Sequence, residues 1–420
     1  MFAIIGFLYF LVCLHRVSPT VIARDLAQSF AADAVILGII SSSYFFTYSA
    51  VQPLVGILSD TVGPRKVITT FSLIAAIGAF IFATAPSALI ATMGRALVGA
   101  GVGGVFIPSL KIFSQWYRAN EFASLTGIMI AIGGIGGLSA ALPLTYLVVL
   151  LGWRASFVSL GVLSIILATT CWIIVKDSPQ EKGWPAVIID DPETKIDTEA
   201  TSNSAGLWKR LAMVFGSLNF WMIVLATFFT GGVFLTFQGL WAVPYLMDVF
   251  GMNRVRAGWF LMLLPFGFAV GGPAFGFLTD RLSLNRKYVL LGALGLGVLG
   301  WIIMLFLNKN SSPLFLIPLF LIFGAGAGGC LPIYFTVTKE LFPPWLMGTA
   351  VGLMNPAAFL GAALYQPFSG FLLNKLSTAD SVVYPLESYR TLLIVFLLSF
   401  IAAYIATALL SNPKGWKRQR

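Results

Sequence analysis

The segment Gly99-Ala100-Gly101-Val102-Gly103-Gly104 occurs twice in this 420-residue chain, because Gly324–Gly329 repeats it, with one substitution, 225 residues later. Further matches fall at nearly the same offset. They are Gly127-Ile128-Met129 with Gly352-Leu353-Met354, Pro19 with Pro244, and Gly56-x-Leu58-x-Asp60 with Gly276-x-Leu278-x-Asp280. Unrelated matches at nearly one offset indicate an internal repeat of about half the chain, which is how many secondary transporters are built.

The composition is that of a membrane protein. Hydrophobic residues make up 58% of the chain, charged residues only 10%, and the mean hydropathy is +0.91, whereas soluble domains carry about 25% charged residues. A cytosolic enzyme, a secreted domain and a nucleic-acid binder are therefore excluded, and the net charge of +10 forms no basic patch interleaved with aromatic residues. One histidine and three cysteines provide neither a metal cluster nor a disulfide framework.

Twelve apolar runs are long enough to cross a bilayer, which takes about 20 helical residues. They are too long and too weakly alternating for strands, so we expect an all-α membrane protein with twelve transmembrane helices. The expected spans are residues 2–24, 35–58, 67–85, 88–116, 122–149, 154–175, 217–247, 256–279, 287–307, 313–338, 345–373 and 389–411. The first begins at Met1 without the n-region of a secretory signal peptide.

A polar stretch from Lys176 to Arg210, rich in proline and acidic residues and without helical periodicity, separates two sets of six spans. The expected domains are an N-terminal six-helix half (1–175), a cytoplasmic linker (176–212), a C-terminal six-helix half (213–412) and a basic cytoplasmic tail (413–420). With the linker inside, sixteen lysines and arginines lie on the cytoplasmic side against seven outside. This asymmetry predicts a multi-pass protein of the cell membrane with both termini in the cytoplasm.

The loop between the second and third expected spans reads Gly56-Ile57-Leu58-Ser59-Asp60-Thr61-Val62-Gly63-Pro64-Arg65-Lys66. It resembles the signature loop of the major facilitator superfamily, Gly276–Lys287 resembles a degraded second copy, and Gly152-Trp153-Arg154 is also similar to a superfamily motif. The resemblance covers the whole chain. It implies two pseudo-symmetric six-helix halves that transport a small molecule by alternating access.

The resemblance also implies roles for charged residues at the span ends. Asp60, Arg65 and Arg118 would belong to a cytoplasmic charge network that latches one conformation and breaks during transport. Asp280 holds the corresponding position in the second half. The alternative is an anchor that obeys the positive-inside rule and has no dynamic role.

Three cations fall inside expected spans, namely Arg16, Arg95 and Lys111, whereas all sixteen acidic residues lie in loops or at span ends. A charge at the bilayer centre costs at least about 2.5–3.5 kcal/mol and therefore indicates a functional site. Without an intramembrane carboxylate to pair with these cations, the expected counter-ion is an anionic substrate.

Arg16 is the strongest candidate, because it lies about 21 Å along the first span, just past the midplane. The stretch His15-Arg16-Val17-Ser18-Pro19 resembles the first span of the anion:cation symporters and organophosphate antiporters, which implies that Arg16 binds the anionic group. The planar guanidinium can meet a carboxylate bidentately. The alternative is an arginine that snorkels to the interface.

The repeat places Trp241 opposite Arg16, where the organophosphate antiporters carry a second arginine, and this favours a singly charged or partly apolar anion. Gln238 and Tyr245 lie one turn to either side of Trp241. Other polar residues expected to complete the substrate cavity are Tyr44, Tyr48, Gln52, Tyr334, Asn355 and Gln366. For Trp241 an interfacial location, and for the others interhelical hydrogen bonds, are the alternatives.

Arg95 and Lys111 are candidates for gating, with snorkelling as the alternative. The symporters named above often carry a proton-coupling glutamate in the fourth span, but Val102 occupies that position here. His15 is then the only intramembrane group that titrates near neutrality, as a proton carrier or as a structural residue.

We therefore expect a monomeric secondary transporter of a small organic anion, a carboxylate above all, in a lipid bilayer, with or without a co-transported proton or other ion. We expect no enzyme activity, cofactor, metal or nucleic-acid partner. A carrier of zwitterionic amino acids or short peptides is the alternative within the class. A transporter-fold receptor or a membrane-embedded enzyme would be alternatives of another class.

Overall fold

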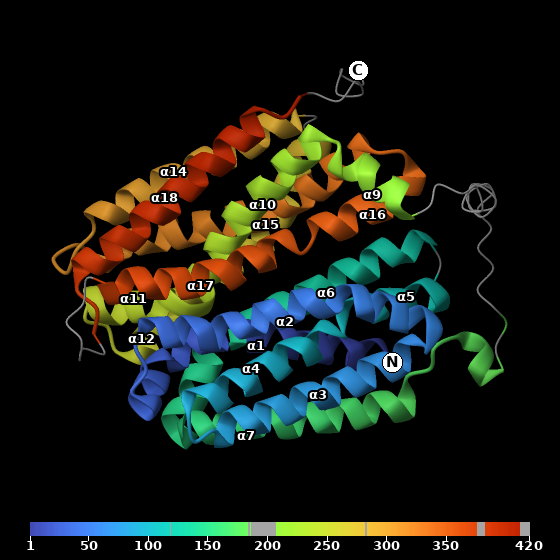
Figure 1. Cartoon of the computed structure of the whole chain (residues 1–420), viewed down its shortest axis with the longest axis horizontal. Coiled ribbons are helices and arrows are strands. Elements are labelled where there is room, and N and C mark those ends of the chain that lie inside the picture. Colours follow the sequence, from blue (N-terminus) through green and yellow to red (C-terminus); the bar gives the residue numbers. More distant parts are fainter. Residues whose placement is uncertain (118, 184, 186–206, 282–283, 376–382, 412–420) are drawn as a thin grey trace. The chain divides into compact units, whose positions relative to one another are not determined.

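The computed structural model describes residues 1–117, 119–183, 185, 207–281, 284–375 and 383–411. Every regular element in these ranges is a helix, which confirms the expected all-α fold (Figure 1). The first elements are α1 (Phe2–Phe30), α2 (Ala34–Thr61), α3 (Pro64–Thr84), α4 (Ala88–Gly103), α5 (Phe106–Trp116), α6 (Ala119–Ser139), α7 (Leu142–Ile174) and η1 (Pro179–Lys182).

The chain continues through helices that include two π-helical segments, η2 and η3. These elements are α9 (Leu207–Phe215), α10 (Leu218–Thr236), η2 (Phe237–Trp241), α11 (Ala242–Val249), α12 (Arg254–Leu261), α13 (Leu263–Gly276), η3 (Phe277–Arg281), α14 (Arg286–Phe306), η4 (Pro313–Phe315), α15 (Leu316–Leu341), α16 (Pro344–Met354), α17 (Ala357–Lys375) and α18 (Leu386–Ala408). Helix α9 occupies the end of the expected linker, where the sequence showed no helical period.

Among the residues that the structure describes, ten helical stretches are long and apolar enough to cross a membrane, and a shorter apolar helix covers Leu125–Ser139. The two expected spans outside these ten are interrupted. Residues 122–149 are divided between α6 and the start of α7, and α7 continues through a kink at Gly152 into the next expected span. Gly152 has φ 79°, a backbone conformation that glycine adopts at little cost.

The span expected over residues 345–373 is divided between α16 and α17, with Asn355 and Pro356 at the break. Proline cannot donate a main-chain hydrogen bond, so the helix restarts after it. A similar break at Gly104 and Val105 separates α4 from α5 inside the expected fourth span. These breaks shorten the individual helices without removing the apolar character of the segments.

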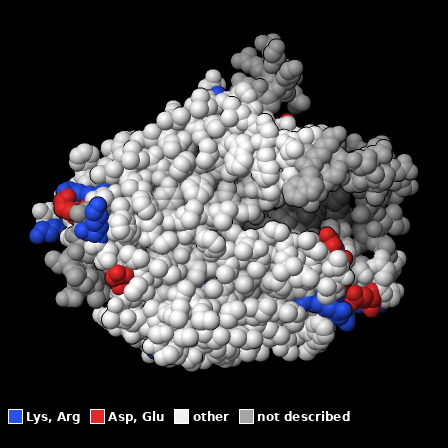
Figure 2. Space-filling view, viewed as in Figure 1, with Lys and Arg blue, Asp and Glu red and all other residues white. Residues whose placement is uncertain are grey.

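The outer surface of the helices is apolar. Leu150 is 77% exposed and Phe306 74%, which suits contact with lipid and not with water. On the face shown in Figure 2, the charged side chains of the described residues lie toward the margins, and a broad area between them carries none. On this face the charges thus lie where a bilayer would tolerate them.

The chain forms two compact units. The first consists of Met1–Ile189, Thr236–Pro265 and Ala363–Tyr389, and the second of Asp190–Leu235, Phe266–Ala362 and Arg390–Arg420. This division differs from the expected one, because two segments of the expected C-terminal half join the first unit. The pseudo-symmetric halves over 1–175 and 213–412 stay a prediction from the repeat.

In the first unit, α1 packs against α6 and α7 and also contacts η2 and α11, while α3 packs against α4 and α7. Helices α2 and α17 cross at very short range. A Cβ atom at Gly38 would overlap the main-chain carbonyl of Gln366, and one at Gly370 would overlap the carbonyl of Ala34. Glycine at both positions therefore permits a main-chain contact that a larger residue would prevent.

Candidate functional site

Arg16 lies in the middle of α1 and is half-buried. The thiol of Cys13 and the phenol groups of Tyr9, Tyr44 and Tyr48 lie near its guanidinium. Tyr9 and Cys13 come from the preceding turns of α1, and the other two tyrosines from α2. The arginine is thus surrounded by groups that can donate or accept hydrogen bonds at the centre of an apolar helix bundle.

A proline fixes the main chain next to Arg16. Pro19 has no N–H, so the carbonyl oxygen of His15, four residues earlier, lacks its usual helical donor. Both terminal nitrogens of Arg95 donate to that oxygen at 3.2 Å, and the hydroxyl of Ser18 donates to it at 3.0 Å. Arg95 is fully buried, so it does not snorkel. It ties α4 to α1 one residue away from Arg16.

Tyr44 supports the same region from α2. Its hydroxyl donates to the carbonyl oxygen of Val12 at 3.1 Å, and the guanidinium of Arg95 lies 4.9 Å from the centre of its ring. Tyr48 stacks on Tyr44 with ring centres 6.1 Å apart. Both tyrosines are buried. Tyr44 is therefore fixed by contacts within the protein, whereas Tyr48 lies one turn further along the same face.

Gln238 and Trp241 belong to the π-helical segment η2, a rare helix type that is frequent at functional sites. Trp241 is fully buried, and its indole nitrogen donates to the hydroxyl of Ser369 on α17 at 2.6 Å. This burial argues against an interfacial location for Trp241. Gln238 is only 5% exposed. Both residues lie in the first unit with Arg16.

Gln366 on α17 is close to this segment. A Cβ atom at Gly239 would lie 3.5 Å from both the Arg16 main-chain oxygen and the Gln366 amide nitrogen. Gln366 is fully buried, and neither end of its amide has a hydrogen-bond partner among the described residues. Two signals in the sequence mark it, a polar residue in an apolar span and the proline that follows it.

The remaining expected site residues are placed differently. Tyr245 is fully buried in α11 among aromatic rings, 5.3 Å from Tyr389 and 6.2 Å from Phe237 between ring centres. Asn355 is half-buried at the break between α16 and α17 and belongs to the second unit. A role in substrate binding stays a prediction for both.

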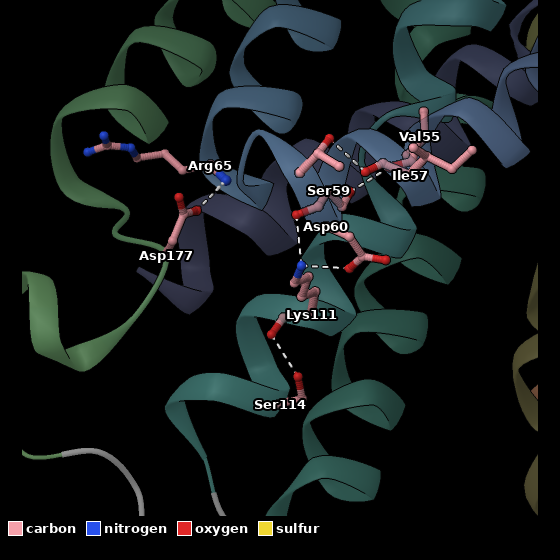
Figure 3. A network of polar contacts seen from close by, with 9 residues as sticks. Val55, Ile57, Ser59, Asp60, Arg65, Lys111, Ser114 and Asp177 are labelled. Carbon is pink, nitrogen blue, oxygen red and sulfur yellow. Dashed lines mark hydrogen bonds and ion pairs between the residues drawn. The ribbon is translucent and has the colours of Figure 1, made fainter. Parts of the chain in front are cut away.

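The signature loop forms a polar network, which we call the signature-loop network. Its residues are Ser59, Asp60, Arg65, Lys111 and Asp177. The Lys111 ammonium lies 2.6 Å from the Asp60 carboxylate and donates to the Ser59 carbonyl oxygen at 2.8 Å (Figure 3). The expectation that Lys111 has no acid to pair with is therefore wrong, because the end of α2 brings Asp60 within reach of the middle of α5.

Arg65 is held by a residue that sequence reasoning missed. Its main-chain N–H donates to the Asp177 carboxylate at 2.6 Å (Figure 3). Its guanidinium lies 4.9 Å from the ring centre of Trp172. Gly63 comes two residues before Arg65 and has φ 100°. A Cβ atom at this position would overlap the Asp177 carboxylate, so glycine leaves room for it. Arg118 and the side chain of Asp280 lie outside the described residues, so their expected part in a latch stays a prediction.

A second charged network, which we call the Asp248 cluster, joins the end of α1 to α11 and α12. It consists of Arg24, Asp25, Asp248, Arg254 and Tyr389. Asp248 is almost fully buried and pairs with Arg24, and the hydroxyl of Tyr389 donates to it at 2.7 Å. Asp25 and Arg254 form an ion pair at 2.7 Å. Arg24 and Asp25, adjacent residues of α1 with opposite charges, thus pair with oppositely charged residues on α11 and α12.

Tyr384 completes the buried surroundings of Asp248. Its main-chain N–H donates to the carboxylate at 3.2 Å. Burial, and to a lesser extent the negative charge of Asp248, raise the pKa of the Tyr384 phenol, so the phenol stays protonated at neutral pH. Close by, Asn374 on α17 donates to Asp33, the residue that caps α2, at 2.9 Å. Since α1 and α2 are antiparallel neighbours, the two networks lie at opposite ends of the first unit.

The helical fold, the signature loop, the half-buried Arg16 and the buried Arg95 are those of a membrane transporter. The family model of the Major Facilitator Superfamily matches residues 3–365 and 224–419, so the chain belongs to this superfamily.

Three known proteins illustrate the relationship. Over 280 residues, 66% of this chain and 63% of the other, it is 26% identical to the probable sulfoacetate transporter SauU of Cupriavidus necator. Over 367 residues, 84% and 75% of the two chains, it is 27% identical to monocarboxylate transporter 11 of Mus musculus. A solved D-xylose-proton symporter has the same fold, with TM-score 0.76, 15% identity and 99% and 98% of the two chains covered.

Proposed function

We propose that this protein moves a small organic anion, a carboxylate above all, across the cell membrane by alternating access, and that Arg16 binds the anionic group. The observation that carries the proposal is the place of Arg16, half-buried in the middle of α1 beside the phenols of Tyr9, Tyr44 and Tyr48. A guanidinium and hydroxyl groups in a low-dielectric bundle suit a carboxylate or sulfonate.

The names of two relatives support this substrate class, since one is described as a probable sulfoacetate transporter and the other as a monocarboxylate transporter. Trp241 and Gln238, which lie in the same unit, would bound the less charged part of the anion. A single arginine with an indole nearby suits a singly charged anion better than a phosphate dianion.

In this proposal, the two charged networks act as gates on the two sides of the binding site. We assign the Asp248 cluster, with the close crossing of α2 and α17, to the outer gate, and the signature-loop network to the cytoplasmic side. The outer contacts join helices from the two repeats in one unit. They would have to break when the binding site opens outward.

Uptake into vesicles tests the substrate class. Purified protein in liposomes is given radiolabelled pyruvate, sulfoacetate or the zwitterion alanylalanine, and initial rates are compared with those of the Arg16→Ala variant. We expect uptake of an organic anion that the variant loses. Uptake of alanylalanine alone would favour the alternative substrate class, and transport of the anion by Arg16→Ala at the wild-type rate would refute the role of Arg16.

The exposed Arg256 provides the matched control. Its side chain carries the same charge at the end of a helix, outside the proposed site. Arg256→Ala should transport at the wild-type rate, which separates loss of the binding group from loss of one positive charge on the protein.

A further inference from the structure

A narrow cavity lies inside the first unit, beside the turn of α1 that carries His15 and Arg16. Helices α1, α3, α4 and α7 enclose it, and it has room for about one water molecule. Its polar wall consists of His15, Ser72 and Ser164. Leu8, Leu11, Ala75, Val102 and Val105 form the apolar remainder.

The polar groups in this cavity are buried and unsatisfied. His15 is 0% exposed and Ser72 3%, and neither ring nitrogen of His15 nor the Ser72 hydroxyl has a hydrogen-bond partner among the described residues. Ser164 donates to the Leu160 carbonyl, which leaves its oxygen able to accept. A buried polar group without a partner costs about 1–3 kcal/mol, and a water molecule with two to four polar partners removes that cost.

The charges around His15 make its protonation depend on an anion. Arg95 on α4 holds its carbonyl oxygen and Arg16 follows it in the chain, and Tyr44 on α2 and Cys13 on α1 are the titratable groups near these two arginines. On the remaining sides, α3 and α7 present Ser72, Ser164 and the ring of Phe157, 6.1 Å from the imidazole. An imidazolium here would add a third positive charge to a buried site, unless an anion at Arg16 offsets it.

We propose that this cavity is a hydrated proton site, in which a water molecule bridges Ser72 and the imidazole of His15, and His15 binds a co-transported proton when an anion occupies Arg16. The proton passes from bulk water through the bridging water to an imidazole nitrogen, and it leaves by the reverse step when the anion departs. This inference rests on the proposed function. It adds the coupling ion and the residue that carries it.

Binding measurements at different pH values test the coupling. If one proton is taken up with each anion, affinity rises about tenfold for each unit by which the pH falls, as linkage requires. Thermal shift gives the apparent affinity of purified protein for pyruvate and sulfoacetate between pH 5.5 and 7.5. His15→Gln should bind the anion with no such slope, and Ser72→Ala should show a shallower slope than the wild type.

The single histidine of the chain allows a direct measurement. In protein labelled with ¹⁵N-histidine, the imidazole nitrogen signals should move toward those of imidazolium when the anion is added at pH 6, and they should not move in Arg16→Ala. An anion that binds the wild type without moving these signals or showing a pH slope would overturn the proton site. Failure of both anions to stabilise the wild type would instead overturn the proposed function.

Discussion

Both terminal guanidinium nitrogens of Arg95 lie 3.2 Å from the main-chain carbonyl oxygen of His15. The carbonyl is available because Pro19, four residues later, has no N–H to offer. A proline in α1 thus creates an acceptor, and an arginine from α4 occupies it. This pairing fixes the turn of α1 that carries the proposed anion-binding residue.

Removal of the guanidinium should destabilise the protein. Arg95→Met leaves the His15 carbonyl with only Ser18 as donor, so we expect the free energy of unfolding to fall by about 1.5–3 kcal/mol, the usual range for hydrogen bonds to charged groups. Thermal denaturation in detergent measures the effect.

A second substitution tests the role of the proline. Pro19→Ala restores the main-chain donor to the His15 carbonyl, so Arg95→Met should cost less in that background. If Arg95→Met costs the same in the wild type and in the Pro19→Ala variant, the carbonyl contact is not the source of the stability.

The pair of Asp60 and Lys111 should govern transport more than stability. The Asp60 carboxylate is 75% exposed, and exposed ion pairs contribute about 0–1 kcal/mol. We expect Asp60→Asn to lower initial uptake rates while the protein is expressed and melts as the wild type does. The exchanged pair, Asp60→Lys with Lys111→Asp, should recover part of the rate, and normal uptake by Asp60→Asn alone would exclude a latch.

Asp248 should control the outer gate. Asp248→Asn leaves Arg24 without its charged partner. Breaking a buried ion pair destabilises the conformation that contains it by about 3–5 kcal/mol. The closed outer conformation should therefore lose population. In a background with the three native cysteines replaced by serine, Thr20→Cys reports on opening, because Thr20 is buried against the Val243 amide.

We expect Asp248→Asn to increase the labelling of that cysteine by a membrane-impermeant maleimide. Asp177→Asn, a change at the opposite end of the unit, is the control and should not increase it. Equal labelling of Asp248→Asn and its parent would show that the Asp248 cluster does not hold the outer end closed.

The close crossing of α2 and α17 should also hold the outer end closed. Gly38→Leu places side-chain atoms where the main chain of Gln366 lies, so the helices must separate. Labelling of Thr20→Cys should rise again. Gly127→Leu provides the matched control, because a Cβ at Gly127 meets no atom within 4 Å; the same rise in both variants would rule out the crossing as its cause.

The positions of the helices and of the signature loop could be predicted from the sequence. Apolar runs located the helices, and the signature loop located Asp60 and Arg65, because hydrophobic length and local turn chemistry depend on neighbouring residues. The break at Asn355 and the kink at Gly152 were not predicted, since a span and an interrupted span have nearly the same hydropathy.

Partners across the fold were harder to predict. Asp60 was expected in a charge network, but its ion pair with Lys111 was not predicted, because only the packing of α2 on α5 could indicate it. The pairing of Arg24 with Asp248 joins residues 224 positions apart. The unsatisfied amide of Gln366 likewise depends on tertiary contacts and leaves no local signal beyond a polar residue in an apolar run and the proline that follows it.

Binding of an organic anion to the wild type and to Arg16→Ala tests the central claim most directly. Pyruvate or sulfoacetate at about 100 times its dissociation constant should stabilise the folded wild type by about 2.7 kcal/mol. Thermal shift should show this stabilisation for the wild type and for Arg256→Ala, and none for a folded Arg16→Ala. An unchanged shift in Arg16→Ala would contradict the account.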